Sequence, residues 1–225
     1  MLASYEAFDY TPIVQAVTQF AIVDLSAFYL DVSKDRLYTF RADAVERRSA
    51  QTAQYVIADE LCRLVAPVLA MTSDEVWQRL PGARETSVHL AEFSPNLEQW
   101  LDADLEARWT QLLDVRGLVN QALEGARQRK EIGSALAASV RVSASGQAAE
   151  LLERSRGDLP MLFIVSAVDV SHHGSDGLGV EVSHAPGEKC PRCWRFVTTI
   201  VADGERAGLC TRCAEALGGV VASGR

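Results

Sequence analysis

Residues 190–194 read CPRCW and residues 210–213 read CTRC, so two C-x-x-C pairs lie near the C-terminal end of the sequence. Sixteen residues, 194–209, separate the two pairs. This spacing is typical of a zinc ribbon. Four thiolates match the tetrahedral preference of Zn²⁺ and close its coordination sphere, so no position is left for water or substrate. The pattern therefore predicts one structural zinc ion bound by Cys190, Cys193, Cys210 and Cys213.

Two disulfides in a secreted domain are the alternative for these cysteines. Disulfides stabilise small chains in oxidising compartments, whereas this chain has 225 residues of which 48% are hydrophobic. Residues 1–11 include Glu6 and Asp9 and lack the basic segment that begins a secretory signal. Zinc is therefore the favoured interpretation, and a cytoplasmic location is expected. The fifth cysteine, Cys62, lies in a helical stretch and is expected to be a buried apolar residue.

The charge of the chain is unevenly distributed. The formal net charge of −8 argues against nonspecific coating of DNA, and no DNA partner is expected. Residues 186–225 nevertheless carry six Lys and Arg against four Asp and Glu. No apolar run approaches the roughly 20 residues that span a bilayer, so no membrane partner is expected either.

Arg192, Arg195 and Arg212 lie in or beside the two cysteine pairs, where a bound metal would fix the backbone. Guanidinium groups held on a rigid loop can address phosphates or base edges in a forked geometry. They could equally neutralise the thiolate cluster. The two roles are compatible, and both stay open at the level of sequence.

The first part of the chain predicts four helices. Residues 11–12 (Thr-Pro) predict the cap and first turn of an amphipathic helix that ends at a charged break over residues 31–39. Further helices are predicted over about 43–66 and 104–129, and a capping box at 72–75 opens a short one. Four helices with short connections favour an antiparallel bundle.

The pattern changes after residue 134. Alternating residues 139–144 predict a strand, 147–156 a helix and 161–170 a buried strand, with which 180–185 would pair. The predicted fold class is therefore mainly α: an antiparallel helical bundle, a small α/β junction unit and a C-terminal zinc ribbon with four cysteine ligands. The corresponding domains are residues 1–134, 135–185 and 186–225.

No catalytic signature is found along the chain. The sequence lacks a G-x-x-x-x-G-K-[ST] phosphate loop, an H-E-x-x-H pair and a G-x-S-x-G elbow. Its carboxylates, such as Asp74 and Glu75, fall at expected helix caps and on helix faces. We therefore expect no catalytic residues and a binding region that is not an enzyme by itself.

Several segments together resemble one family. Residues 26–38 (SAFYLDVSKDRLY), 47–53 (RRSAQTA) and 67–77 (PVLAMTSDEVW) are similar to consecutive segments of bacterial isoleucyl-tRNA synthetases, which are class I aminoacyl-tRNA synthetases. Residues 189–194 with 209–213 resemble the zinc module at the C-terminus of that family. Sister enzymes for valine and leucine share looser forms of the helical segments, so the zinc module is the discriminating part. Residues 144–185 fit only in general terms.

The resemblance implies a C-terminal fragment that carries the anticodon-binding and zinc domains. The catalytic Rossmann domain of the family, with its HIGH-like and KMSKS-like motifs, and the editing insertion lie upstream. The whole isoleucine–tRNA ligase uses ATP to charge tRNA(Ile) with isoleucine, and the parent enzyme is expected to be monomeric. The fragment would bind the anticodon region of tRNA(Ile) and be inactive alone. A stand-alone zinc-stabilised RNA- or protein-interaction module derived from a synthetase is the alternative.

Anticodon bases are unstacked and can be read on aromatic side chains. The resemblance makes Trp194 and Arg192 the first candidates for RNA contact, although Trp194 could instead pack under the ribbon. The other candidates are basic residues of the zinc module, of the charged break after the first helix and of the start of the second helix. They are Arg195, Arg212, Lys34, Arg36, Arg41, Arg47 and Arg48. Those outside the zinc module could instead be solvated charges.

Overall fold

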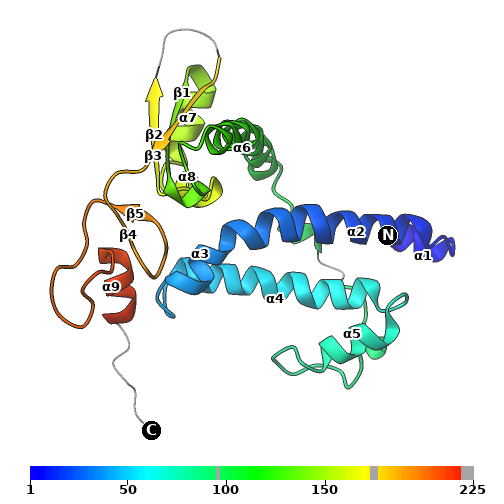
Figure 1. Ribbon diagram of the computed structural model, residues 1–225. Helices are drawn as coiled ribbons and strands as arrows, with labels where there is room; N and C mark the ends of the chain where they lie inside the picture. Colours follow the sequence, from blue (N-terminus) through cyan, green and yellow to red (C-terminus); the bar gives the residue numbers. More distant parts are fainter. Residues whose placement is uncertain (95–96, 173–176, 219–225) are drawn as a thin grey trace. The chain divides into compact units, whose positions relative to one another are not determined.

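The computed structural model describes residues 1–94, 97–172 and 177–218, and their contacts divide the chain into two compact units (Figure 1). The first unit comprises Met1–Leu37 and Ala42–Leu101. The second comprises Tyr38–Arg41 and the described residues from Asp102 onward. Most described residues are helical, and they are accompanied by a small three-stranded sheet and a cluster of cysteines. The mainly helical class is thereby confirmed.

The first unit begins with α1 (Leu2–Glu6). After residues 7–10, which are not helical, an uninterrupted helical run begins at Thr11. This run consists of α2 (Thr11–Gln19), the π-helical segment η1 (Phe20–Leu30) and α3 (Asp31–Thr39). The predicted charged break over 31–39 is therefore wrong. The segment contains no Gly or Pro that would stop a helix, and the Lys34 ammonium lies 2.6 Å from the Asp31 carboxylate across one helical turn.

The run Thr11–Thr39 is also long and apolar enough, by length and composition alone, to cross a bilayer. Its most apolar window has a mean hydropathy of 1.5, and only 6% of that window is buried. No membrane-spanning segment was expected from the sequence, because Gln, Thr and Ser interrupt the apolar residues of this run. Asp24 is nevertheless the only charged residue between Pro12 and Leu30, which keeps the mean hydropathy high. A single helix near the N-terminus is weak evidence for a membrane span, since helices of soluble proteins and signal sequences meet the same criteria.

Helix α4 (Val45–Val65) lies beside this run, as Figure 1 shows. The Tyr29 hydroxyl donates to the Ala50 carbonyl at 3.3 Å, and the Tyr5 hydroxyl donates to the Leu64 carbonyl at 2.6 Å. Because the earlier tyrosine meets the later carbonyl, the two helical segments run antiparallel. The remaining elements of the unit are α5 (Ala70–Trp77) and the 3₁₀ turns η2 (Val88–Leu90) and η3 (Leu97–Trp100).

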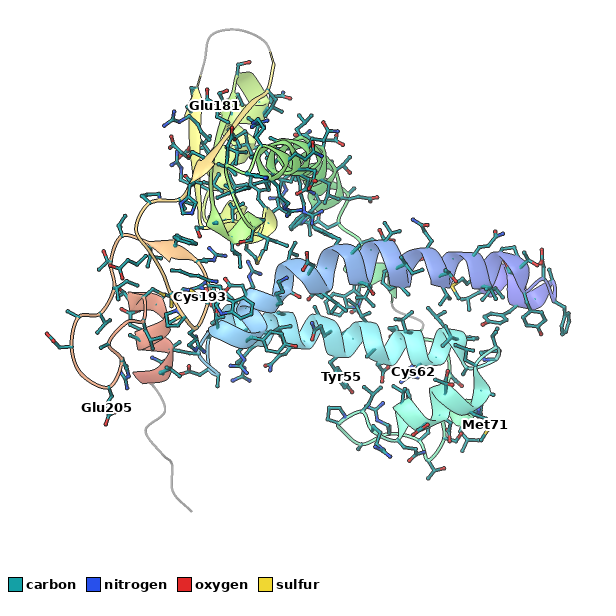
Figure 2. All side chains as sticks on the ribbon, viewed as in Figure 1. Tyr55, Cys62, Met71, Glu181, Cys193 and Glu205 are labelled. Atoms are coloured by element: carbon teal, nitrogen blue, oxygen red, sulfur yellow. The ribbon has the colours of Figure 1, made fainter. Side chains whose placement is uncertain are left out.

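A small core at the C-terminal end of α4 is built around Trp77, which is fully buried. The indole Nε1 donates to the Glu85 carbonyl at 2.9 Å. The guanidinium groups of Arg63 and Arg84 lie 4.8 and 4.5 Å from the ring centroid, within cation–π range. Cys62, labelled in Figure 2, is a buried member of this core, which confirms its expected apolar role.

The capping box predicted at 72–75 is wrong. Helix α5 begins earlier, with Leu69 as its N-cap residue, so Thr72 lies inside the helix. The Asp74 carboxylate instead accepts hydrogen bonds from the Ser87 hydroxyl at 2.7 Å and from the Val88 amide at 3.0 Å. These two bonds, the Ser87 bond first, hold the pKa of Asp74 below its usual value and fasten the following loop to α5.

Acid should therefore weaken this loop. The folded pKa of Asp74 is depressed, so its stabilising contribution is present above the unfolded pKa of about 4 and is lost as the pH falls through the folded value. We expect hydrogen exchange at the Val88 amide to rise between about pH 5 and pH 3, after correction for intrinsic rates. In Asp74→Asn, exchange at the Val88 amide should already be raised at pH 5 and should change less as the pH falls. Asp24→Asn, at an exposed position of the same unit, should follow the unmodified chain. An identical pH profile in Asp74→Asn would contradict the assignment.

The second unit contains the long helix α6 (Ala103–Gln128), close to the predicted 104–129. The Asp102 carboxylate caps it by accepting from the Leu105 amide at 2.9 Å. Its buried face packs on the sheet and on α7 (Gly146–Arg154). The contacts thus group α6 with the sheet, whereas the sequence grouped it with the preceding helices. The boundaries at residues 134 and 185 stay a prediction.

The sheet has the strand order β2-β1-β3. The central strand β1 (Ala138–Ala144) is parallel to β2 (Ala167–His172) and antiparallel to β3 (Gly179–His184). The predicted pairing of 180–185 with 161–170 is therefore wrong, because each strand pairs with β1. The predicted strand 161–170 is also divided, since α8 (Leu159–Leu162) precedes β2 and has Pro160 in its first turn, where proline favours a helix start.

The described elements that follow β3 form the zinc module. A short antiparallel pair, β4 (Glu188–Lys189) and β5 (Phe196–Val197), is followed by α9 (Thr211–Gly218). The Phe196 amide donates to the Ser166 hydroxyl at 2.7 Å, which joins the module to the segment before β2. Gly187 has φ +92°, and a side chain there would collide with the Val197 carbonyl. The predicted domain 186–225 extends beyond the described residues, which end at Gly218.

Candidate zinc centre and nucleic-acid interface

The four predicted cysteine ligands come together in one buried cluster, marked by Cys193 in Figure 2. Their Sγ atoms all lie within 4.8 Å of one another, and those of Cys193 and Cys210 are 3.8 Å apart. A tetrahedral zinc with Zn–S bonds of about 2.3 Å places sulfurs about 3.8 Å apart, whereas a disulfide needs about 2.0 Å. All cysteines are free thiols. The cluster thus fits a closed structural zinc site, as the sequence predicted.

Local backbone geometry prepares the first pair of ligands. Cys190 and Cys193 lie on the turn between β4 and β5, which is closed by the Cys190 amide donating to the Arg195 carbonyl at 2.9 Å. The Cys210 amide donates to the Cys190 sulfur at 3.4 Å. Burial raises the pKa of Cys190, but amide donors from Cys193, Cys210 and Arg192 outweigh it and lower the pKa to about 6. A lowered pKa favours the ionised thiol, which is the form that binds metal.

Arg192 contacts the cluster and another segment of the second unit. One guanidinium nitrogen donates to the Thr39 carbonyl at 2.6 Å and to the Cys213 sulfur at 3.5 Å. The other donates to the Tyr38 carbonyl at 3.2 Å. Of the two roles left open by the sequence, these contacts support neutralisation of the thiolates.

Trp194 projects into solvent, with 60% of its surface exposed. Its φ of +64° is uncommon for a residue other than glycine, and its amide donates to the Cys190 carbonyl at 2.9 Å. The Lys189 ammonium lies 5.7 Å from the centroid of the indole ring. The alternative of packing under the ribbon is therefore wrong, and the structure presents an aromatic ring beside a positive charge.

Arg195 and Arg212, both partly buried, line a pocket of about 360 Å³ next to Cys193 and Cys210. Three threonine side chains, Thr198, Thr199 and Thr211, line the same pocket. The guanidinium of Arg212 also lies 5.1 Å from the ring centroid of Phe40. The pocket is therefore lined by two arginines and three threonines, residue types whose donors suit a phosphate.

The nine predicted RNA-contact residues fall into two groups. The structure assigns five of them to the second unit, where the exposed Arg41 belongs to the segment Tyr38–Arg41 that contacts the zinc module. The members of this group are Arg41, Arg192, Trp194, Arg195 and Arg212. The other four belong to the first unit, on α3 and the first turn of α4. They are Lys34, Arg36, Arg47 and Arg48.

Two neighbouring residues were not predicted from the sequence. Tyr38, 77% exposed, ends the quoted segment 26–38, and its carbonyl is held by Arg192. Lys189 directly precedes the first cysteine and accompanies Trp194. Both residues lie inside the segments that resemble the synthetase family, residues 26–38 and 189–194, so the signal for them was present in the sequence.

Comparison with known proteins places these features in a family. The family model described as the anticodon-binding domain of tRNA ligase matches residues 1–142. A second model, described as a zinc finger found in FPG and IleRS, matches residues 187–216. The latter range contains all four zinc ligands, so the two matches cover the helices and the metal centre separately.

Two relatives match nearly the whole chain. The isoleucine–tRNA ligase of Geobacter sulfurreducens is 43% identical over 224 residues, which is 96% of this chain and 24% of the relative. That of Syntrophotalea carbinolica is 46% identical over 223 residues, 95% of this chain and 24% of the relative. The chain thus spans about a quarter of the length of the curated relatives it matches.

These matches confirm the resemblance of the sequence to isoleucyl-tRNA synthetases. The first model covers well over half of the chain, and the similarity to the two ligases continues through the zinc finger. The chain belongs to the anticodon-binding domain family of tRNA ligases, in the form that carries the zinc finger of isoleucine–tRNA ligases.

Proposed function

We propose that the chain is the C-terminal tRNA-binding part of an isoleucine–tRNA ligase. It recognises the anticodon region of tRNA(Ile), so that the whole enzyme can charge this tRNA with isoleucine using ATP. The observation that carries the proposal is the exposed ring of Trp194. It lies on the turn between β4 and β5 that carries two of the zinc ligands, with the Lys189 ammonium beside it. Unstacked anticodon bases bind to such platforms by stacking, at about 1–3 kcal/mol per base.

Each group of the zinc module has a role in this proposal. The metal, when bound, orders the turn that carries Trp194, and takes no part in bond-making. Arg195 and Arg212 contact the RNA backbone from the pocket that they line with three threonines. Arg41 adds a charge from the neighbouring segment. Because the chain as a whole is acidic, RNA affinity is confined to this local surface.

The larger organisation is part of the same proposal. Residues 1–134 form the helical anticodon-binding domain with an antiparallel arrangement, 135–185 the α/β junction and 186–225 the zinc domain. Lys34, Arg36, Arg47 and Arg48 add phosphate contacts from the helical domain. The parent enzyme is cytoplasmic and monomeric, and the chain alone is inactive because it has no catalytic signature. Its partner is tRNA, and neither DNA nor a membrane.

Replacing Trp194 by Ala should weaken binding of the tRNA(Ile) anticodon stem-loop. Loss of one stacked base predicts a cost of about 1–3 kcal/mol, roughly 5- to 150-fold in dissociation constant. Zinc content and thermal stability should be unchanged, because the ring is mostly exposed. Fluorescence anisotropy with a labelled stem-loop measures the affinity.

Trp100→Ala is the matched control, since Trp100 is 64% exposed on η3 of the first unit. It should leave the affinity within twofold, at about 0.4 kcal/mol or less. Equal losses in both variants would contradict a specific role of Trp194. A stem-loop with altered anticodon bases tests the reading itself. Equal binding of both RNAs, or of neither, would favour the alternative of a stand-alone interaction module.

A further inference from the structure

The turn between α3 and α4 belongs to the zinc module in space, although more than 150 residues of sequence separate the two. Tyr38–Arg41 clusters with the second unit, while the residues on both sides of it belong to the first. The bond from Arg192 to the Thr39 carbonyl spans 153 residues of sequence. The Thr39 side chain is buried as well. The module thus holds a segment that no local preference of the sequence would bring there.

The contacts of Arg192 have a simple electrostatic reason. Tyr38 and Thr39 are the last two residues of α3, and the final carbonyls of a helix lack intrahelical donors and carry partial negative charge. The nitrogen that donates to the Thr39 carbonyl also donates to the sulfur of Cys213. Four thiolates around one Zn²⁺ carry a net charge of about −2. One cation therefore lies between two negative groups, and its planar fork reaches both.

We propose that Arg192 is a positioning residue that couples zinc occupancy to the order of the α3–α4 turn. With the metal bound, the start of α9, which carries Cys213, is fixed and Arg192 caps α3 through two carbonyls. When the metal is lost, the two C-x-x-C pairs are no longer joined. Arg192 then loses its fixed position, and the α3–α4 turn becomes less ordered. Arg212 lies in the second C-x-x-C pair, and its contact with the Phe40 ring also links metal binding to the order of the α3–α4 turn.

This coupling also defines the RNA surface more closely, a step that rests on the proposed function. The exposed residues Tyr38 and Arg41 lie in the segment Tyr38–Arg41, which Arg192 holds through backbone carbonyls. Trp194 is exposed on the turn that carries Arg192. The RNA surface then consists of two turns from distant parts of the chain, which are held in register by Arg192. Loss of Arg192 should weaken RNA binding even though its own donors face the protein.

The test is hydrogen exchange of peptides that cover residues 38–43, measured on the full chain with zinc content determined in parallel. In Arg192→Gln we expect exchange to rise about tenfold or more, as for loss of a charge-assisted hydrogen bond. Chelation of zinc from the unmodified chain should produce a similar rise. In Arg192→Gln, chelation should add little at these residues. Arg206→Gln is the matched control, because Arg206 also donates to a carbonyl of the module, that of Leu217, at 3.5 Å.

A second variant covers the case in which Arg192→Gln loses its metal. Arg192→Lys keeps a cation near the sulfur but cannot span both carbonyls, so it should retain zinc and still show raised exchange. Wild-type exchange in both variants, or an equal rise on chelation in Arg192→Gln and the unmodified chain, would overturn the proposal. If exchange rises while affinity for the stem-loop is unchanged, the positioning role of Arg192 is supported and the role of the turn in RNA binding is contradicted. The two proposals are therefore tested separately.

Discussion

Cys210→Ser should remove stoichiometric zinc from the chain and unfold the zinc module, while the helices of the first unit still melt cooperatively. The buried core of the module consists of the four cysteines, against which Val197, Ile200 and Leu209 pack. So small a core cannot order a segment of this length by itself. Structural zinc binding by such modules contributes about 10–16 kcal/mol at neutral pH. Losing one ligand therefore removes the main source of order in residues 187–216.

Metal analysis and hydrogen exchange together measure this outcome. Zinc per chain should fall from one to well below it, and amides of β4 and β5 should lose protection. Cys62→Ala is the matched control, because Cys62 is an equally buried free thiol that belongs to the Trp77 core. It should retain zinc while lowering the stability of the first unit. Unchanged metal content in Cys210→Ser would exclude the assigned site.

The zinc ligands could be read from the sequence because their chemistry is local. Each C-x-x-C pair is a short turn, and the metal requirement fixes which residue types fill it. The role of Arg192 could not be read in this way. Its acceptors are carbonyls of Tyr38 and Thr39, which any residue type would supply. Contacts to backbone atoms from a distant segment leave no signature in the residues that receive them.

The helices show where pattern reasoning fails. The ranges predicted for α4 and α6 are close to those observed, since both have long apolar periodicities. The charged stretch 31–39 was interpreted as a break, yet charge does not stop a helix when no Gly or Pro interrupts it. The strand predicted over 161–170 failed for a different reason. Apolar content alone does not separate a strand from a buried helical turn, and Pro160 favoured the turn.

Trp77→Ala should be the most destabilising single change in the first unit. Large-to-small replacement of a buried aromatic residue costs about 3–5 kcal/mol, and Trp77 has no exposed surface. The change also leaves the Glu85 carbonyl without its indole donor and removes the ring that the guanidinium groups of Arg63 and Arg84 both contact. We expect the unfolding transition of the first unit to shift to lower urea concentration. Zinc content should stay at one per chain.

The size of this effect follows from what the indole ring joins. It holds the C-terminal end of α4, helix α5 and the turn η2 in a single core with Cys62, Ala66 and Val88. Since Arg84 also bonds the Asp59 carboxylate at 3.1 Å and the Tyr55 hydroxyl at 3.0 Å, loss of the ring should loosen a network that reaches along α4. Trp100→Ala, at a mostly exposed position, should cost less than about 1 kcal/mol. Similar costs for the two variants, measured by urea unfolding with circular dichroism, would show that the Trp77 core does not organise this unit.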